Sequence, residues 1–197
     1  MSNIIEKEVR GALTKEIAEK ISFYAKEKGW KEHSYKQVSI YCDTDHIPAI
    51  GSVNGGKGRL IVDIRDSGIK IKIKLGNALS FERKEYTIKC SSESYEAIGV
   101  LLKVFNVKNG FVRTFDRTDY VTPDGVQLTV KLNCLMGDHY ELERNSDDPK
   151  TVDSFGRILD ELSLVVWTKE ELAQAIQNDH DKVVSQDICA FLKEFGK

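Results

Sequence analysis

The segment Ile69–Leu75 reads Ile-Lys-Ile-Lys-Ile-Lys-Leu, an unbroken alternation of apolar and charged residues. Successive side chains of a β-strand point to opposite faces, so Lys70, Lys72 and Lys74 share one face and the aliphatic residues share the other. The segment therefore predicts a strand that has one charged face and one apolar face.

The same division recurs along the chain. Asp63 and Arg65 alternate with aliphatic residues, as do Glu141 and Glu143. Eight strands are predicted, at residues 4–10, 37–42, 59–65, 69–75, 83–90, 110–117, 126–133 and 139–143. Helices are predicted at residues 14–28, 94–105 and 149–162, after the capping box that begins at Thr168, and at residues 181–195. Short turns between the strands favour an antiparallel sheet, so the expected class is α+β.

Two architectures satisfy these charged and apolar faces. An open antiparallel sheet would turn its charged face to water, where cross-strand ion pairs form. A closed barrel would turn the charged faces inward and cover the apolar faces with helices packed outside. Its interior would then offer lysine and arginine to phosphate oxygens and carboxylates to Mg²⁺ or Mn²⁺. The alternation alone leaves both architectures open.

Bulk properties narrow the classes of function. With 197 residues the chain is long enough for one well-buried core, so we expect a single domain over residues 1–197. The net charge of −2 argues against nonspecific binding of nucleic acid. The sequence shows neither a signal-peptide pattern nor an apolar run of about 18 residues, so we expect a cytoplasmic protein with no membrane partner.

Six short motifs occur in a recognisable order between residues 4 and 143. They are Glu6-Lys-Glu-Val-Arg10, Tyr41-Cys-Asp-Thr44, Val62-Asp-Ile-Arg65 with Ile71-Lys-Ile-Lys74, Glu82-Arg-Lys-Glu-Tyr86, Arg117-Thr-Asp-Tyr120 and Met136-Gly-Asp-His-Tyr-Glu-Leu-Glu143. In this order they resemble the motifs of the CYTH family, the triphosphate tunnel metalloenzymes. That family includes inorganic and thiamine triphosphatases, some RNA triphosphatases and class IV adenylyl cyclases. Residues 144–197 lie outside the resemblance and are predicted to be a helical C-terminal part.

The resemblance implies a fold and a site. The fold is an eight-stranded, closed antiparallel β-barrel, the triphosphate tunnel. Divalent metal, Mg²⁺ or Mn²⁺, would bind to Glu6, Glu8, Glu141 and Glu143. Glu6, Glu8 and Arg10 would be the catalytic residues. The resemblance assigns phosphate binding to Arg65, Lys74, Arg83 and Arg117. By their charge and their place on the strands, we add Lys70, Lys72, Arg59, Arg113 and Lys131.

Three positions depart from the family's motifs. Arg10 stands where the family has a lysine, and Asp63 replaces an arginine. Lys131 falls where the family has the aspartate of a second metal site, twelve residues before Glu143. A cation at that position opposes metal binding, so one bound metal is expected instead of two.

Three functions remain open at this stage. The leading hypothesis is a metal-dependent hydrolase of inorganic triphosphate or a nucleoside triphosphate. An adenylyl cyclase of class IV would use the same site, and a non-catalytic protein would only bind the nucleotide or triphosphate. The expected partner is a small triphosphate or nucleotide, and an RNA 5′-triphosphate end fits the same chemistry. The sequence does not indicate the oligomeric state.

Overall fold

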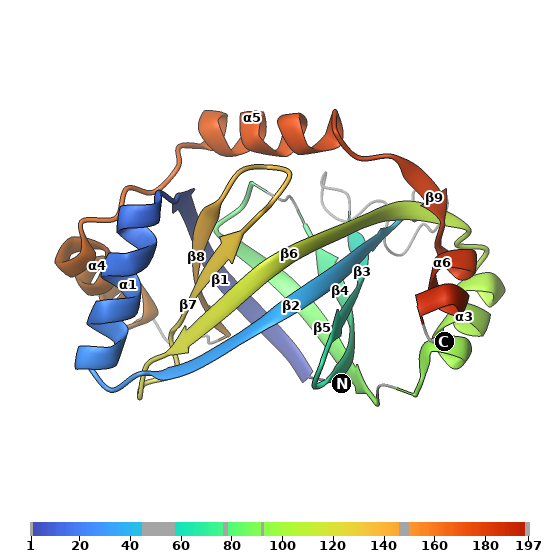
Figure 1. Cartoon of the computed structure of the whole chain (residues 1–197), viewed down its shortest axis with the longest axis horizontal. Coiled ribbons are helices and arrows are strands. Elements are labelled where there is room, and N and C mark those ends of the chain that lie inside the picture. The colour runs from blue at the N-terminus through green and yellow to red at the C-terminus, as the bar shows by residue number, and fades with distance from the viewer. Residues whose placement is uncertain (1, 45–57, 77–78, 92, 146–149, 196–197) are drawn as a thin grey trace. The chain divides into compact units, whose positions relative to one another are not determined.

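A computed structural model describes residues 2–44, 58–76, 79–91, 93–145 and 150–195 (Figure 1). Its strands are β1 (Ser2–Ala12), β2 (Lys31–Cys42), β3 (Arg59–Arg65), β4 (Gly68–Leu75), β5 (Glu82–Cys90), β6 (Asn109–Val121), β7 (Gln127–Leu132), β8 (His139–Asn145) and β9 (Ser185–Asp187). Its helices are α1 (Lys15–Glu27), α3 (Tyr95–Val104), α4 (Lys150–Leu162), α5 (Lys169–His180) and α6 (Ile188–Phe195). Pro149, the predicted first residue of α4, lies outside the described residues.

The strands form a closed antiparallel barrel. Their order is β2-β3-β4-β5-β1-β8-β7-β6, and β2 also pairs with β6, which closes the sheet into eight strands. The short strand β9 is added beside β6. Because a closed sheet has no unpaired edge, the barrel satisfies its own backbone hydrogen bonds. The predicted α+β fold with an eight-stranded closed barrel is confirmed.

The chain divides into two compact units, which are described in turn. Unit 1 comprises residues 1–3, 36–114 and 182–197, and unit 2 comprises residues 4–35 and 115–181. The long strands β2 and β6 contribute residues to both units.

The core of unit 2 lies between strands and the helices α1 and α4. Leu128 and Val130 of β7 and Tyr140 and Leu142 of β8 pack in one cluster, which also holds Ile21 of α1 and residues of α4. Thr14 caps α1 by accepting a hydrogen bond from the backbone N–H of Ile17, as the sequence predicted. Figure 1 shows α1 and α4 next to each other. The apolar face of these strands is therefore the face that the helices cover.

The core of unit 1 has the same construction. Val62 of β3 and Ile71 of β4 pack with Ile98 of α3 and with Ile188 and Leu192 of α6. The helices α3 and α6 also pack against each other. In this unit too, the helices cover the apolar face, and the alternate strand residues carry the charges.

The charged faces are shielded from solvent although they carry no helix. Asp63 is only 3% exposed, Glu141 4% and Arg117 5%. An open sheet with a wet charged face would leave such side chains largely exposed. The open-sheet interpretation is therefore wrong, and the closed barrel accounts for the buried charges.

The end of the chain differs from its prediction. In place of one helix over residues 181–195, the chain forms a turn, the strand β9 and the helix α6. Two β-branched residues, Val183 and Val184, disfavour the helix before β9. Asp187 pairs with Asn109 of β6 and accepts a hydrogen bond from the backbone N–H of Ala190 at 2.9 Å, which caps the first turn of α6. No helix in the described part of the chain has the length and hydropathy that crossing a membrane requires.

Candidate metal and phosphate site

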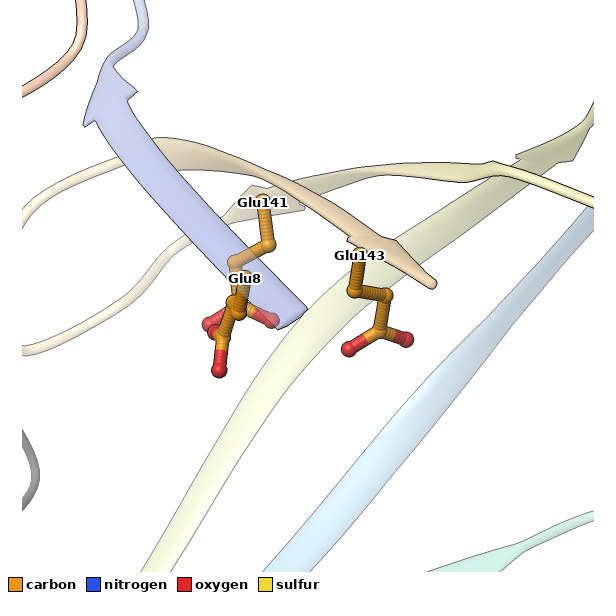
Figure 2. Close-up of side chains that lie close together, drawn as sticks. All are labelled: Glu8, Glu141 and Glu143. Atoms are coloured by element: carbon orange, nitrogen blue, oxygen red, sulfur yellow. The ribbon is translucent and has the colours of Figure 1, made fainter. Parts of the chain in front are cut away.

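An acidic cluster forms in unit 2 where β1 pairs with β8. The register places Glu8 opposite Glu143 and Arg10 opposite Glu141. Figure 2 shows the side chains of Glu8, Glu141 and Glu143 extending from these two strands in one direction, and one ligand oxygen from each lies within 4.8 Å of the others. Carboxylate oxygens in such a group are the ligands that Mg²⁺ and Mn²⁺ prefer. These three residues are the candidate metal ligands of the described chain.

Each carboxylate oxygen of Glu141 is paired with a cationic side chain. Arg10 donates from Nε to Oε1 at 2.8 Å, and the Lys131 ammonium lies 2.5 Å from Oε2. His139 Nε2 lies 3.5 Å from Oε1. Burial opposes ionisation of Glu141, but Lys131 and Arg10 outweigh it and hold the pKa of Glu141 well below its ordinary value. Glu141 is therefore an ionised and charge-compensated carboxylate.

Glu143 is held differently. Its Oε1 accepts a hydrogen bond from Gln127 Nε2 at 2.6 Å, and Arg117 Nη2 lies 3.4 Å from the same oxygen. Its other oxygen makes no hydrogen bond or ion pair within the described parts of the chain. Burial raises the pKa of Glu143, and Glu6, Glu141 and Glu8 raise it further against the influence of Arg117. Glu143 therefore presents one unengaged oxygen beside other carboxylates.

Glu6 belongs to the same strand face but not to the group of three. It is buried and pairs with Asn145 in the strand register. Its negative charge contributes to the raised pKa of Glu143. The metal-ligand geometry nevertheless includes Glu8, Glu141 and Glu143 alone among the described acidic residues.

A polar network extends from Arg117 along the same face. Arg117 donates from Nε to Asp119 Oδ1 at 2.6 Å and from Nη2 to Thr129 Oγ1 at 3.2 Å. The hydroxyl of Tyr35 donates to Asp119 Oδ2 at 2.7 Å. Burial opposes ionisation of Asp119, but Arg117 and these hydrogen bonds lower its pKa. The network fixes the guanidinium of a residue that the sequence assigned to phosphate binding.

Trp167, in the C-terminal part of unit 2, contacts two neighbours of the acidic cluster, His139 and Arg10. Its ring stacks on His139 with the centroids 5.8 Å apart, and its backbone N–H donates to the carbonyl of Arg10 at 2.8 Å. A side chain at Gly11 would collide with Tyr140 and with the carbonyl of Val165, so the segment before Trp167 requires glycine on β1. Residues 164–167 thus reach the backbone beside the acidic cluster.

Unit 1 carries a charged face in which cations predominate. Asp63 accepts a hydrogen bond from Ser39 Oγ at 2.6 Å, and Lys72 Nζ lies 3.1 Å from its other oxygen. Arg65 lies at 4.0 Å. Burial opposes ionisation of Asp63, but Lys72, Ser39 and Arg65 outweigh it and lower its pKa below the ordinary range.

Five further cations that the sequence singled out lie on strands of unit 1. The strand register places Arg59 opposite Lys74 and Lys70 opposite Asp63. Lys74 pairs with Glu85 across β4 and β5, with Nζ 3.2 Å from Oε2. Arg83 is buried on β5, and the guanidinium of Arg113 lies 4.1 Å from the ring centre of Tyr41. Together with Arg65 and Lys72, these residues form the cationic face of unit 1.

Sequence reasoning missed several members of the site. Asp119, Gln127, Thr129 and His139 contact the predicted residues and received no role. Their strand positions carry a usable signal, because Asp119 shares a face with Arg117, and Gln127 and Thr129 share one with Lys131. Trp167 gave no such signal, because it lies outside the strands.

Comparison with known proteins identifies the fold. No family's sequence profile matches the chain, and no curated protein sequence matches it. Among solved structures, the PH1012 protein from Pyrococcus horikoshii OT3 is similar with a TM-score of 0.64 at 19% identity, covering 82% of this chain and 94% of that one. A candidate adenylate cyclase from Vibrio parahaemolyticus gives a TM-score of 0.61 at 11% identity, covering 87% of this chain and 99% of that one.

A third solved structure has a described activity. HpAC1 from Hippeastrum, named as a candidate adenylyl cyclase with a dominant triphosphatase activity, gives a TM-score of 0.56 at 16% identity and covers 83% of this chain and 89% of that one. These likenesses, together with the closed eight-stranded barrel, show that the chain has the fold of a CYTH domain, as its motifs predicted.

Proposed function

We propose that this protein is a divalent-metal-dependent hydrolase of a triphosphate, either inorganic triphosphate or a nucleoside triphosphate. One observation carries the proposal. Glu8, Glu141 and Glu143 bring ligand oxygens within 4.8 Å of one another on a shielded face that also holds Arg10, Arg117 and Lys131. Packing alone does not explain so many buried charges, whereas a metal-bound polyphosphate requires both signs.

The donor set fits Mg²⁺ or Mn²⁺. All three candidate ligands are carboxylates, and Glu143 has an oxygen that no described side chain engages. The hydrogen bond from Gln127 to its other oxygen is the kind of outer contact that orients a metal ligand. Bound there, the metal would neutralise phosphate charge and lower the pKa of a coordinated water.

The chain's own residues would bind and orient the substrate. Arg10, Arg117 and Lys131 supply cations next to the carboxylates, and Asp119 holds the Arg117 guanidinium by its Nε. In unit 1, Arg65, Lys72, Lys74, Arg83 and Arg113 are assigned to phosphate binding by motif and charge. Phosphoryl transfer depends mainly on such positioning and charge compensation, so no nucleophilic side chain is needed.

Two similar structures introduce an alternative reaction. The proteins from Vibrio parahaemolyticus and Hippeastrum are both named as candidate adenylyl cyclases, and the second has a dominant triphosphatase activity. A cyclase would form cyclic AMP and pyrophosphate from ATP, whereas a hydrolase releases phosphate. We favour the hydrolase because the dominant activity named for the Hippeastrum protein is that of a triphosphatase.

A non-catalytic binder is the third candidate, and the ion pair between Lys131 and Glu141 favours it. A partly buried lysine that compensates a metal ligand weakens metal binding. Such a protein would bind triphosphate through its cations and turn it over slowly or not at all.

The test is phosphate release from inorganic triphosphate, ATP, GTP and thiamine triphosphate with Mg²⁺, with Mn²⁺ and with EDTA. Cyclic AMP is measured in the ATP reactions. We expect metal-dependent release of phosphate that EDTA abolishes. Cyclic AMP as the main product would establish the cyclase, and tight binding of triphosphate without turnover would establish the binder.

A further inference from the structure

The two glutamates that end the last motif are held in opposite ways. One oxygen of Glu141 accepts a hydrogen bond from Arg10, and the other forms an ion pair with Lys131, so each oxygen is paired with a cationic side chain. One oxygen of Glu143 accepts a hydrogen bond from the neutral Gln127 amide and lies farther from Arg117. Its other oxygen makes no hydrogen bond or ion pair with the described residues. Of the two, Glu143 is prepared to bind a metal and Glu141 is not.

Lys131 is the residue that makes Glu141 less available to a metal than Glu143. Its side chain is only 13% exposed, and its ammonium lies 2.5 Å from Glu141 Oε2 and 5.3 Å from the ring centre of Phe115. A lysine so far removed from water pairs strongly with a carboxylate. A divalent ion that binds Glu141 must therefore compete with this ammonium for the same oxygen.

A polyphosphate changes that competition, because its anionic oxygens attract ammonium and guanidinium groups. We infer that Lys131 blocks Glu141 in the free protein, and that binding of a triphosphate draws the Lys131 ammonium away and completes the metal site. This inference rests on the proposed function and concerns the order in which its ligands bind. The expected consequence is that metal and triphosphate each strengthen the binding of the other.

Thermodynamic linkage makes the coupling reciprocal. If triphosphate raises the affinity for Mn²⁺ by some factor, Mn²⁺ raises the affinity for triphosphate by the same factor. Couplings of this kind span about 5-fold to 150-fold. Removing the Lys131 charge should reduce the factor, because Glu141 is then open to the metal before the triphosphate arrives.

The experiment measures Mn²⁺ binding by electron paramagnetic resonance, with free Mn²⁺ buffered, with and without a non-hydrolysable imido-triphosphate. Wild type is compared with Lys131→Met, with Lys131→Arg, which retains the charge, and with Lys15→Met on the exposed surface of α1 as the matched control. Affinity for the analogue is measured in parallel at zero and at saturating Mn²⁺. Thermal unfolding establishes that each variant is folded.

We expect Lys131→Met to bind Mn²⁺ without the analogue about tenfold more tightly than wild type, with a smaller coupling factor. Lys131→Arg and Lys15→Met should keep the wild-type coupling. Equal affinity of wild type and Lys131→Met for Mn²⁺ alone would overturn the inference. If wild type nevertheless releases phosphate in a metal-dependent reaction, only the role of Lys131 fails; if neither protein binds Mn²⁺ nor hydrolyses triphosphate, the proposed function fails with it.

Discussion

The charged faces of the two units arise from the same sequence pattern but differ in sign. In unit 2, Glu8, Glu141 and Glu143 gather with their oxygens within 4.8 Å, and cations are interposed among them. In unit 1, the acids Asp63 and Glu85 are separate, and each pairs with lysine. The first face can hold a metal, whereas the second is suited to phosphate.

The difference shows what alternation does and does not determine. Alternating charged and apolar residues place each side chain on a face, and in both units the apolar face packs on helices. The sign of the charge on the other face comes from the individual residues and from the strand register. Substitutions on one face at a time therefore separate metal binding from phosphate binding.

The largest effect is expected from the double substitution Glu6→Gln and Glu8→Gln in unit 2. Neutral amides bind hard cations weakly but keep the shape of the side chain, so metal-dependent turnover should fall by at least about a hundredfold. Steady-state phosphate release measures the loss, and the unfolding temperature should change little. Glu16→Gln with Glu19→Gln, on the exposed surface of α1, is the matched control. Full turnover by a folded Glu6, Glu8 double variant would remove Glu8 from the metal site and would exclude a supporting role for Glu6.

The next effect concerns the cationic face of unit 1. Lys72→Met with Lys74→Met removes two cations, and the KM for triphosphate should rise roughly 10-fold to 100-fold because charge-assisted hydrogen bonds are lost. Mn²⁺ affinity without substrate should stay unchanged. The control is Lys84→Met with Lys89→Met, which are exposed on β5. An equal rise of KM in both double variants would mean that the face has no specific role in phosphate binding.

A smaller effect is expected at Gln127, which orients Glu143. Gln127→Ala should weaken Mn²⁺ affinity about tenfold, because loss of an outer hydrogen bond leaves the metal ligand less well positioned. Calorimetry with Mn²⁺ and the non-hydrolysable triphosphate measures the change, and Gln174→Ala on exposed α5 is the control. Wild-type affinity in Gln127→Ala would show that the contact does not support the metal site.

The smallest effect concerns stability and pH. Because the folded protein lowers the pKa of Asp63, this carboxylate stabilises the fold above its unfolded pKa of about 3.9, and the contribution fades as pH falls further. Asp63→Asn should reduce the free energy of unfolding by about 1–3 kcal/mol at pH 7. Urea unfolding at pH 7 and pH 3 measures the difference, which should shrink at pH 3. A loss that is as large at pH 3 would exclude the ion pairs as its cause.

Most of the fold was predictable because charged and apolar residues alternate within the barrel strands, which is the period of a β-strand. Residues 59–65 form β3 with the predicted bounds, and the capping box at Thr168 begins α5 as expected. The prediction of one helix over residues 181–195 was wrong. Strand β9 depends on pairing with β6, and the paired residues are about 75 positions apart in the sequence, so no local pattern encodes the contact.

The site was less predictable than the fold. Motif order and strand faces indicated Glu8, Glu141 and Glu143, which do come together. The cation pairing of Glu141 and the amide contact of Glu143 depend on side-chain rotamers and on the register between β7 and β8. Sequence reasoning fixes the face on which a residue lies, but it cannot say which of several cations reaches a given oxygen.

The most direct test of the account is the position and number of bound Mn²⁺ ions. X-ray diffraction near the manganese absorption edge, from crystals grown with Mn²⁺ and the non-hydrolysable triphosphate, locates each ion by its anomalous signal. With the triphosphate analogue bound, we expect one Mn²⁺, held by the carboxylates of Glu8, Glu141 and Glu143. An ion held only by other residues, or no ion in the acidic cluster, would contradict the proposed metal site.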